Sequence, residues 1–318
     1  MLLIEVRGDL VIQECKLMNN IELQSKILKL KEEKQAIILA HNYQTLPVQQ
    51  IADFTGDSLQ LSRVASELKQ ELVVFCGVQF MAETAKLLKP SAKVLLPVKE
   101  AGCPMADMIT GEQLRNFKAQ YQNPVVVCYV NSSIEVKAES DICCTSGNAL
   151  KVINSIPADK QILFVPDRNL GSYAAKLTGR NIILWQGFCN VHENITEADI
   201  LEVKSKYPGY KLIVHPECRP SVVEMADFAA STKGMIDYVK DHDKVIVGTE
   251  TGLFYQLQDK YPEKKLAPIS KNNICVNMKK TYLEDVLRSL EREEFEISIQ
   301  ADIAKKALRS VENMLSIR

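Results

Sequence analysis

The chain has 318 residues, of which 46% are hydrophobic and 25% are charged, and its net charge at pH 7 is −1. This composition is typical of a soluble globular protein, and the small net charge predicts no attraction to nucleic acid or to a membrane. No apolar run approaches the roughly 18 residues of a membrane span. Residues 1–10 carry charges where a signal peptide needs an apolar core, and the nine cysteines form no extracellular-type framework, so a reducing cytoplasm is expected.

In chain order, residues 19–34 first predict an amphipathic helix. Short apolar runs then alternate with amphipathic segments, a pattern typical of parallel strands covered by helices on both faces. The runs predict nine strands, at residues 36–40, 72–75, 95–97, 124–128, 162–165, 182–184, 212–214, 245–247 and 266–269. A further amphipathic stretch, from Ile303 to Leu315, predicts a C-terminal helix that packs back onto a neighbouring unit.

Three cysteines are evenly spaced along these elements. Cys103, Cys189 and Cys275 are separated by 86 residues each, and each follows an apolar run of strand type. One such triple among nine cysteines can arise by chance, so the spacing means something only if other features keep the same frame.

Other features recur at nearly the same interval as the three cysteines. A polar tip follows the first strand of each copy, at His41-Asn42-Tyr43, Tyr129-Val130-Asn131 and His215-Pro216-Glu217. Small hydroxyl residues recur before amphipathic segments, at Ser58, Ser146 and Thr232. After each cysteine a capping-box pattern is predicted, at Thr110/Gln113, Thr196/Asp199 and Thr281/Glu284. The chain is therefore predicted to be three copies of one unit, over residues 1–123 with the N-terminal helix, 124–210, and 211–318 with the C-terminal helix.

The predicted fold class is α/β, with three homologous αβα-sandwich domains whose parallel sheets are arranged about a pseudo-threefold axis. Loops after the carboxyl ends of parallel strands gather on one edge, so the axis would bring the three cysteines and the polar tips to one cavity. The alternative is three independent domains with separate sites, each with one thiol, which is too few to hold a metal.

Three convergent thiolates favour a particular cofactor. Structural zinc usually takes four ligands, often in C-x₂₋₄-C pairs that this chain lacks. Three cysteines from three domains suit a 4Fe–4S cluster with one open iron, which can act as a Lewis acid. The alternative, that a cysteine is an ordinary core residue, is kept for Cys15, Cys76, Cys128, Cys143, Cys144 and Cys218.

The chain resembles the quinolinate synthase family. The resemblance covers about residues 36–280 and rests on Ala40–Gln44, Ala52–Leu59, Gly77–Ala85, Thr145–Ala149 and Val214–Cys218. It implies a 4Fe–4S cluster on the pseudo-threefold axis, and condensation of iminoaspartate with dihydroxyacetone phosphate to quinolinate, a precursor of NAD. It also implies coupling to the enzyme that makes iminoaspartate. Some members carry a C-x-x-C-x-x-C run at the third ligand, where this chain has only Cys275.

The chemistry of the side chains suggests roles for the residues that recur in the three copies. Carboxylate and phosphate oxygens bind to hydroxyls and N–H groups at helix starts, so Ser58, Ser146 and Thr232 are predicted substrate contacts, with plain helix capping as the alternative. Glu217 is the predicted general base, and Tyr43 and His215 are predicted to donate or relay protons. By the family resemblance, His41, Tyr129 and Asn131 would bind substrate carboxylates.

The other two histidines are given lesser roles. His192, three residues after Cys189, is predicted to act indirectly or structurally. His242 is predicted to be a solvated surface residue.

Two other functions were weighed. Gly56-Asp57-Ser58-Leu59 spells the signature of GDSL-type esterases, but no histidine follows an aspartate by three residues, as their catalytic pair requires. An iron–sulfur sensor without turnover would explain three thiols, although it would leave the three polar tips without a purpose.

Overall fold

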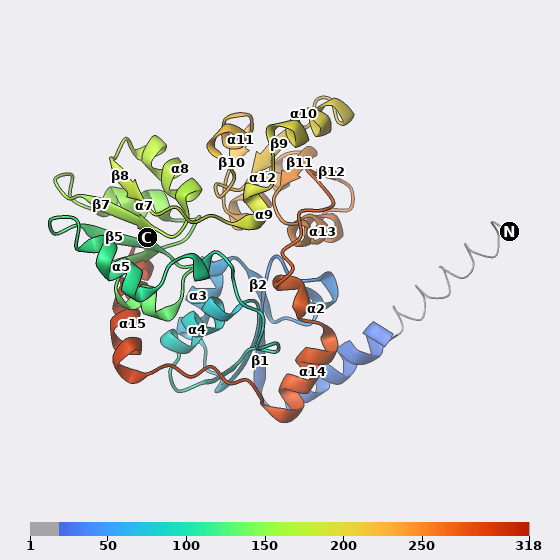
Figure 1. The fold of residues 1–318 in the computed structure, drawn as a ribbon. Helices are drawn as coiled ribbons and strands as arrows, with labels where there is room; N and C mark the ends of the chain where they lie inside the picture. The colour runs from blue at the N-terminus through green and yellow to red at the C-terminus, as the bar shows by residue number, and fades with distance from the viewer. Residues whose placement is uncertain (1–18, 318) are drawn as a thin grey trace.

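The computed structural model describes residues 19–317. Three four-stranded parallel sheets follow one another along the chain, with strand orders β2-β1-β3-β4, β6-β5-β7-β8 and β10-β9-β11-β12. The order is the same in every sheet, so the repeat predicted from the cysteine spacing is a repeat of the fold. Figure 1 shows the three units in blue to cyan, green, and yellow to orange. The segment 1–10 and Cys15 lie outside the described residues.

The first unit is preceded by a helix that spans residues 19–33 of the described chain. The elements of the unit are β1 (Ala36–His41), α2 (Leu46–Gln50), β2 (Phe54–Gly56), α3 (Ser58–Glu67), β3 (Leu72–Cys76), α4 (Gln79–Leu88), β4 (Lys93–Leu95), the 3₁₀ turn η1 (Ala106–Met108) and α5 (Gly111–Lys118).

The second unit repeats this order. Its elements are β5 (Val125–Tyr129), α6 (Ile134–Ala138), β6 (Ile142–Cys144), α7 (Ala149–Ser155), β7 (Ile162–Val165), α8 (Arg168–Thr178), β8 (Ile182–Leu184), α9 (Asn190–Glu193) and α10 (Glu197–Lys206).

The third unit repeats the order again and ends with an extra helix. Its elements are β9 (Lys211–Val214), α11 (Pro220–Glu224), β10 (Phe228–Ala229), α12 (Thr232–Asp241), β11 (Lys244–Gly248), α13 (Thr251–Lys260), β12 (Lys265–Pro268), η2 (Met278–Lys280), α14 (Leu283–Arg292) and α15 (Ala301–Ser316).

Each sheet is covered on both faces because its strands are apolar on both faces. In the second unit, Val127 and Phe164 face the core formed with α7 and α8, while Val126 and Leu163 face the core formed with α5, α6 and α15. The predicted αβα sandwich is confirmed. Within residues 19–317, no helix combines the length and apolar character needed to span a bilayer.

The last helix of each unit packs on the next unit. Leu114 of α5 lies in a core with the second sheet, Ile200 of α10 in a core with the third, and Val286 of α14 in a core with the first. Because each unit packs its last helix on the sheet of the next, the three units close into a ring. The extra helix α15 packs on α6 and β6 of the second unit, so it contacts a neighbouring unit as predicted (Figure 1). The residue ranges proposed for the three repeats stay a prediction.

The expected third capping box is wrong. Thr110 and Thr196 cap α5 and α10 as predicted, but α14 begins one residue later than expected. Its N-cap is Tyr282, whose N–H donates to Asp285 at 2.9 Å. Tyr282 is 86 residues from Thr196, so the fold keeps the repeat interval although the hydroxyl has moved to Thr281.

Candidate functional site

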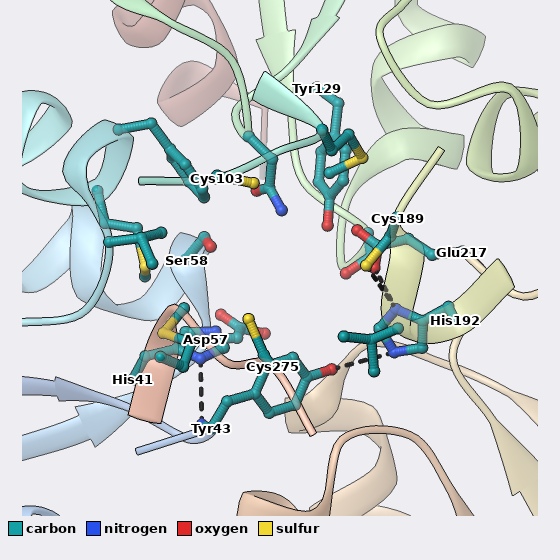
Figure 2. A pocket seen from close by; sticks show the side chains of 18 of the residues that line it. His41, Tyr43, Asp57, Ser58, Cys103, Tyr129, Cys189, His192, Glu217 and Cys275 are labelled. Carbon is teal, nitrogen blue, oxygen red and sulfur yellow. Dashed lines mark hydrogen bonds and ion pairs between the residues drawn. The ribbon is translucent and has the colours of Figure 1, made fainter. Parts of the chain in front are cut away.

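The three units meet at a pocket (Figure 2). Residues predicted from all three repeats line it, namely His41, Tyr43, Ser58, Cys103, Tyr129, Asn131, Ser146, Cys189, His215, Glu217, Thr232 and Cys275. The alternative of three independent domains with separate sites is therefore not what the structure shows.

The three cysteines of the pocket occupy equivalent loops. Figure 2 shows Cys103, Cys189 and Cys275 reaching the pocket from different sides. Two residues before each cysteine, a backbone carbonyl accepts the N–H of a helix start, at 2.8 to 2.9 Å. The donor and acceptor pairs are Gln79 and Ala101, Arg168 and Gly187, and Thr251 and Asn273.

The other described cysteines are core residues, as predicted. Cys76, Cys128, Cys143, Cys144 and Cys218 are buried, whereas the three pocket cysteines are partly exposed. All are free thiols. The fold therefore separates three accessible thiols from five inaccessible ones.

The pocket disfavours bare thiolates. Burial raises the pKa of Cys103 to about 12, and it also raises the pKa of Cys189 and of Cys275. In each case a peptide N–H three residues further on opposes the effect of burial; the donors are Ala106, His192 and Met278. A cationic group between the sulfurs would stabilise the thiolates, because metal binding requires and favours deprotonated cysteine.

Comparison with known proteins identifies the family. The family model described as quinolinate synthetase A protein matches residues 25–316. The chain belongs to the quinolinate synthetase A family. It is 52% identical over 297 residues to a quinolinate synthase of Clostridium acetobutylicum, covering 92% of this chain and 97% of the relative. Quinolinate synthases of Desulforudis audaxviator and Methanoregula boonei are 51% and 49% identical, and each alignment covers 93% of this chain and 98% of the relative.

In this member of the quinolinate synthetase A family, a hydrogen-bonded chain links the third unit to the first. Glu217 Oε2 lies 2.6 Å from His192 Nδ1, and His192 Nε2 lies 2.8 Å from Thr249 Oγ1. Thr249 Oγ1 lies 2.6 Å from the Tyr43 hydroxyl. The four side chains form a continuous path along which a proton can move between carboxylate and phenol.

The titration behaviour of the ends of this chain is set by burial and charge. Burial acts to raise the pKa of Glu217, but His215 and His192 outweigh it and hold the pKa well below its usual range. Burial and the Glu217 charge raise the pKa of Tyr43 and of Tyr129. At neutral pH the pocket therefore pairs an ionised carboxylate with protonated phenols.

The other two pocket histidines each contact a backbone N–H through Nδ1. His41 Nδ1 accepts the N–H of Tyr43 at 3.1 Å, and burial, followed by the charge of Lys279, lowers the pKa of His41 to about 3. His215 Nδ1 lies 3.3 Å from the backbone nitrogen of Glu217 and 3.4 Å from Glu217 Oε2, and its Nε2 lies 3.1 Å from Ser146 Oγ. The bond to Nδ1 leaves a donating Nε2–H on the neutral His41 ring.

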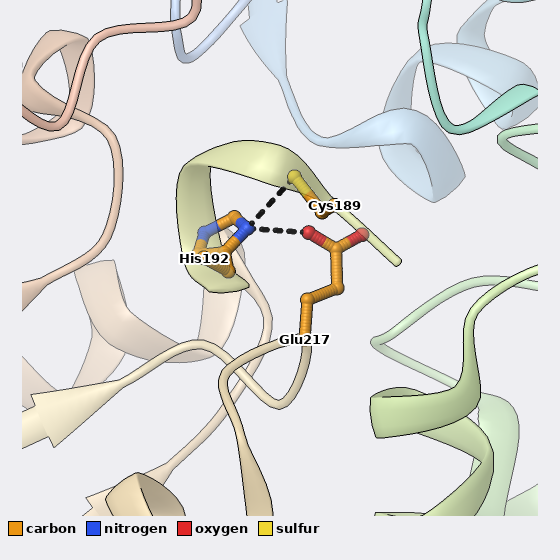
Figure 3. Close-up of side chains that lie close together, drawn as sticks. All are labelled: Cys189, His192 and Glu217. Atoms are coloured by element: carbon orange, nitrogen blue, oxygen red, sulfur yellow. Dashed lines mark hydrogen bonds and ion pairs between the residues drawn. The ribbon is translucent and has the colours of Figure 1, made fainter. Parts of the chain in front are cut away.

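One group of side chains can hold a metal ion. Cys189, His192 and Glu217 offer ligand atoms that all lie within 4.8 Å of one another (Figure 3). His192 Nδ1 is 3.2 Å from Cys189 Sγ, and the His192 ring stacks on His215. The prediction of an indirect role for His192 remains untested.

The three small hydroxyl residues are not helix N-caps. Asp57 and Ser231 cap α3 and α12, and Ser58 and Thr232 are the first helical residues after them. Ser146 precedes Asn148, the N-cap of α7. The capping alternative was wrong because the hydroxyls lie beside the cap positions, where they line the pocket.

Sequence reasoning missed Asp57 and Thr249. Asp57 lines the pocket one residue before a predicted contact, so its place in the motif was an available signal. Thr249 follows β11 directly, at the carboxyl end where site residues are expected. His242, expected to be solvated, is partly buried and stacks on Tyr238 with ring centroids 3.7 Å apart. Among residues 19–317, no histidine hydrogen-bonds to Ser58, which gives the esterase alternative no support.

Proposed function

We propose that the chain is a quinolinate synthase, which condenses iminoaspartate with dihydroxyacetone phosphate and releases phosphate and water during NAD biosynthesis in the cytoplasm. The observation that carries this proposal is the single pocket to which each repeat contributes one accessible thiol and a polar tip. Membership of the quinolinate synthetase A family supports it. Iminoaspartate hydrolyses in water, so functional coupling to the enzyme that makes it belongs to the proposal.

Cys103, Cys189 and Cys275 would hold a 4Fe–4S cluster. The residues fit such a group because three free thiols line one pocket and no fourth cysteine of residues 19–317 lines it. When bound, the cluster supplies an open iron that acts as a Lewis acid toward a carboxylate or hydroxyl of the substrate.

Substrate anions would bind to the polar tips and helix starts. Ser58 and Thr232 begin helices of ten residues, where unpaired N–H groups and the helix dipole favour negative charge. Asn131 Oδ1 is buried and has no partner among the described residues. Together with Tyr129 and His41, Asn131 would orient the two carboxylates of iminoaspartate.

Proton transfer would use the chain from Glu217 to Tyr43. Glu217 Oε1 is buried and has no hydrogen-bond partner among residues 19–317, so it can accept a proton from bound substrate. The Tyr43 phenol is protonated and can donate to a leaving oxygen. Its proton would be restored through Thr249 and His192, while His215, which lies beside Ser146 and Glu217, would bind the substrate.

The cysteine assignment is tested by substitution. Cys103→Ala, Cys189→Ala and Cys275→Ala should each lose the cluster and all formation of quinolinate, whereas Cys144→Ala, a buried cysteine away from the pocket, should keep both. Iron, acid-labile sulfide and product are measured after anaerobic reconstitution. Full iron and sulfide in any of the three pocket variants would remove that residue from the ligand set.

A second candidate rests on the Cys189, His192 and Glu217 group, which could instead hold a single metal ion. A bound mononuclear metal would appear as one metal per chain without acid-labile sulfide, and it would be lost in His192→Ala. Anaerobic incubation with both substrates separates either enzyme from a sensor, because a sensor makes no pyridine dicarboxylate.

A further inference from the structure

We propose that the buried carboxylates of Asp167 and Glu250 are positioning residues that fix two of the three cluster cysteines, Cys189 and Cys275. The proposal rests on the proposed function, because it concerns how this chain holds the cluster. Neither residue lines the pocket. Each makes a bond to a cysteine loop that helix capping alone does not require.

Asp167 uses its two carboxylate oxygens for different partners. It is fully buried and is the N-cap of α8, where Oδ1 accepts the N–H of Leu170 at 2.6 Å. Its Oδ2 accepts the N–H of Cys189 at 3.1 Å. Capping needs only the first of these bonds, so the second is a specific link from the helix start to the cysteine loop.

Glu250 repeats the arrangement in the third unit. It is fully buried at the N-cap of α13, and Oε2 accepts the N–H of Gly252 at 2.6 Å. Its Oε1 accepts the N–H of Cys275 at 3.0 Å. The two side chains differ in length and cap different N–H groups, three and two residues further on, yet both bond to the cysteine N–H, which indicates that this link is what both copies retain.

The third unit adds a connection to the first. Lys279 Nζ lies 2.9 Å from Glu250 Oε1 and also donates to the backbone carbonyl of Tyr43. The ammonium balances the buried carboxylate, and it ties the Cys275 loop to the loop that carries the Tyr43 phenol. Displacement of Glu250 would therefore move a cluster ligand and the proton donor together.

The first copy shows that the carboxylate is an addition to the common fold. Val78 is the N-cap of α4 and makes no side-chain cap bond. The bond from Gln79 to Ala101 is nevertheless present, as in the other copies. The cysteine loop can form without the carboxylate, so Asp167 and Glu250 contribute to the placement of the thiols rather than to the existence of the loops.

The test measures how firmly each variant holds iron. Asp167→Ala and Glu250→Ala are loaded with iron and sulfide anaerobically, and cluster absorbance is followed after addition of a chelator. Residues that orient metal ligands typically change metal affinity about 10–100-fold, so iron release should be at least about tenfold faster. Asp167→Asn and Glu250→Gln, which keep one acceptor oxygen and the side-chain volume, should fall between the alanine variants and the unmodified chain.

Thr110→Ala is the matched control. Thr110 caps α5 through a bond to Gln113 and makes no hydrogen bond to a cysteine. It should lower the urea midpoint of the metal-free chain without accelerating iron release. The electron paramagnetic resonance spectrum of the reduced cluster supplies a second readout, because displaced ligands change its g values while a remote loss of stability does not.

Equal iron release and unchanged spectra in the Asn and Gln variants would overturn the proposal, and these variants carry the test if the alanine variants fail to fold. An unmodified chain that takes up no iron and sulfide would instead overturn the cluster itself, and the proposal with it. If Thr110→Ala also released iron faster, and release in all variants followed the loss of metal-free stability, both residues would be reduced to ordinary caps.

Discussion

At the scale of single residues, Glu217 has two oxygens in different surroundings. Oε2 is held by His192, and Oε1 has no partner among the described residues. Glu217→Gln keeps the size of the side chain but removes the base, so kcat should fall about 100-fold or more, as is typical when a general base is lost. The iron and sulfide content should stay unchanged, because Glu217 is not a proposed cluster ligand. An active Gln variant would exclude the carboxylate as the base.

The Thr249 hydroxyl lies between His192 and Tyr43. Its oxygen is 2.8 Å from His192 Nε2 and 2.6 Å from the Tyr43 hydroxyl. Thr249→Val has nearly the same shape but cannot pass a proton. We expect kcat to fall about tenfold or more while KM changes little, since the substrate contacts remain. Thr178→Val is the control and should leave both constants unchanged, because the Thr178 hydroxyl bonds only to the backbone of Ala174 and Arg180 and does not line the pocket. A change confined to KM in Thr249→Val would contradict the relay.

The sequence predicted this site unevenly. The cysteines and polar tips were found because they recur in a frame, and the three cysteines and two residues of each tip line one pocket. Thr249 has no hydroxyl counterpart in the frame, and its importance depends on contacts with residues 57 and 206 positions away. Such contacts exist only in the folded chain, so no local pattern reports them.

At the scale of elements, the end of α14 is clamped by charge. Glu293 lies 2.7 Å from both Lys34 and Lys93, and the hydrogen bonds from these two ammonium groups lower the pKa of Glu293 to about 2. A carboxyl whose pKa is lowered on folding contributes stability above its unfolded pKa of about 4.5 and loses it as the pH falls toward 2. We therefore expect a fall in the urea midpoint between these pH values that is smaller in Glu293→Gln. Identical pH profiles for the two proteins would contradict the clamp.

Element prediction succeeded where hydrophobicity is continuous. All nine predicted strands are present, with ends displaced by at most two residues. The three short edge strands β2, β6 and β10 were missed because strands of two or three residues have no measurable period. The equally short β4 and β8 were found because their apolar runs continue past the end of the strand. Each of the three missed strands nevertheless ends shortly before a hydroxyl residue that lines the pocket, so the strand helps to position that residue.

At the scale of the whole molecule, the exchange of α5, α10 and α14 makes the three units depend on one another. Leu114 is fully buried against the second sheet although it follows the first cysteine. Leu114→Ala should lower the free energy of unfolding by about 2–5 kcal/mol, and unfolding should remain one transition in urea. Asn116→Ala, on the exposed face of α5, should change it little. Separate transitions for the units would contradict this interdependence.

The helix exchange also bears on how such a chain could arise. A single repeat contains a sheet, one thiol, one polar tip and a terminal helix that fits the neighbour's sheet rather than its own. Three separate copies would therefore close into a domain-swapped homotrimer, the cyclic symmetry that such a heterologous contact permits. Gene triplication would then only have joined an assembly that already existed, after which the repeats were free to diverge.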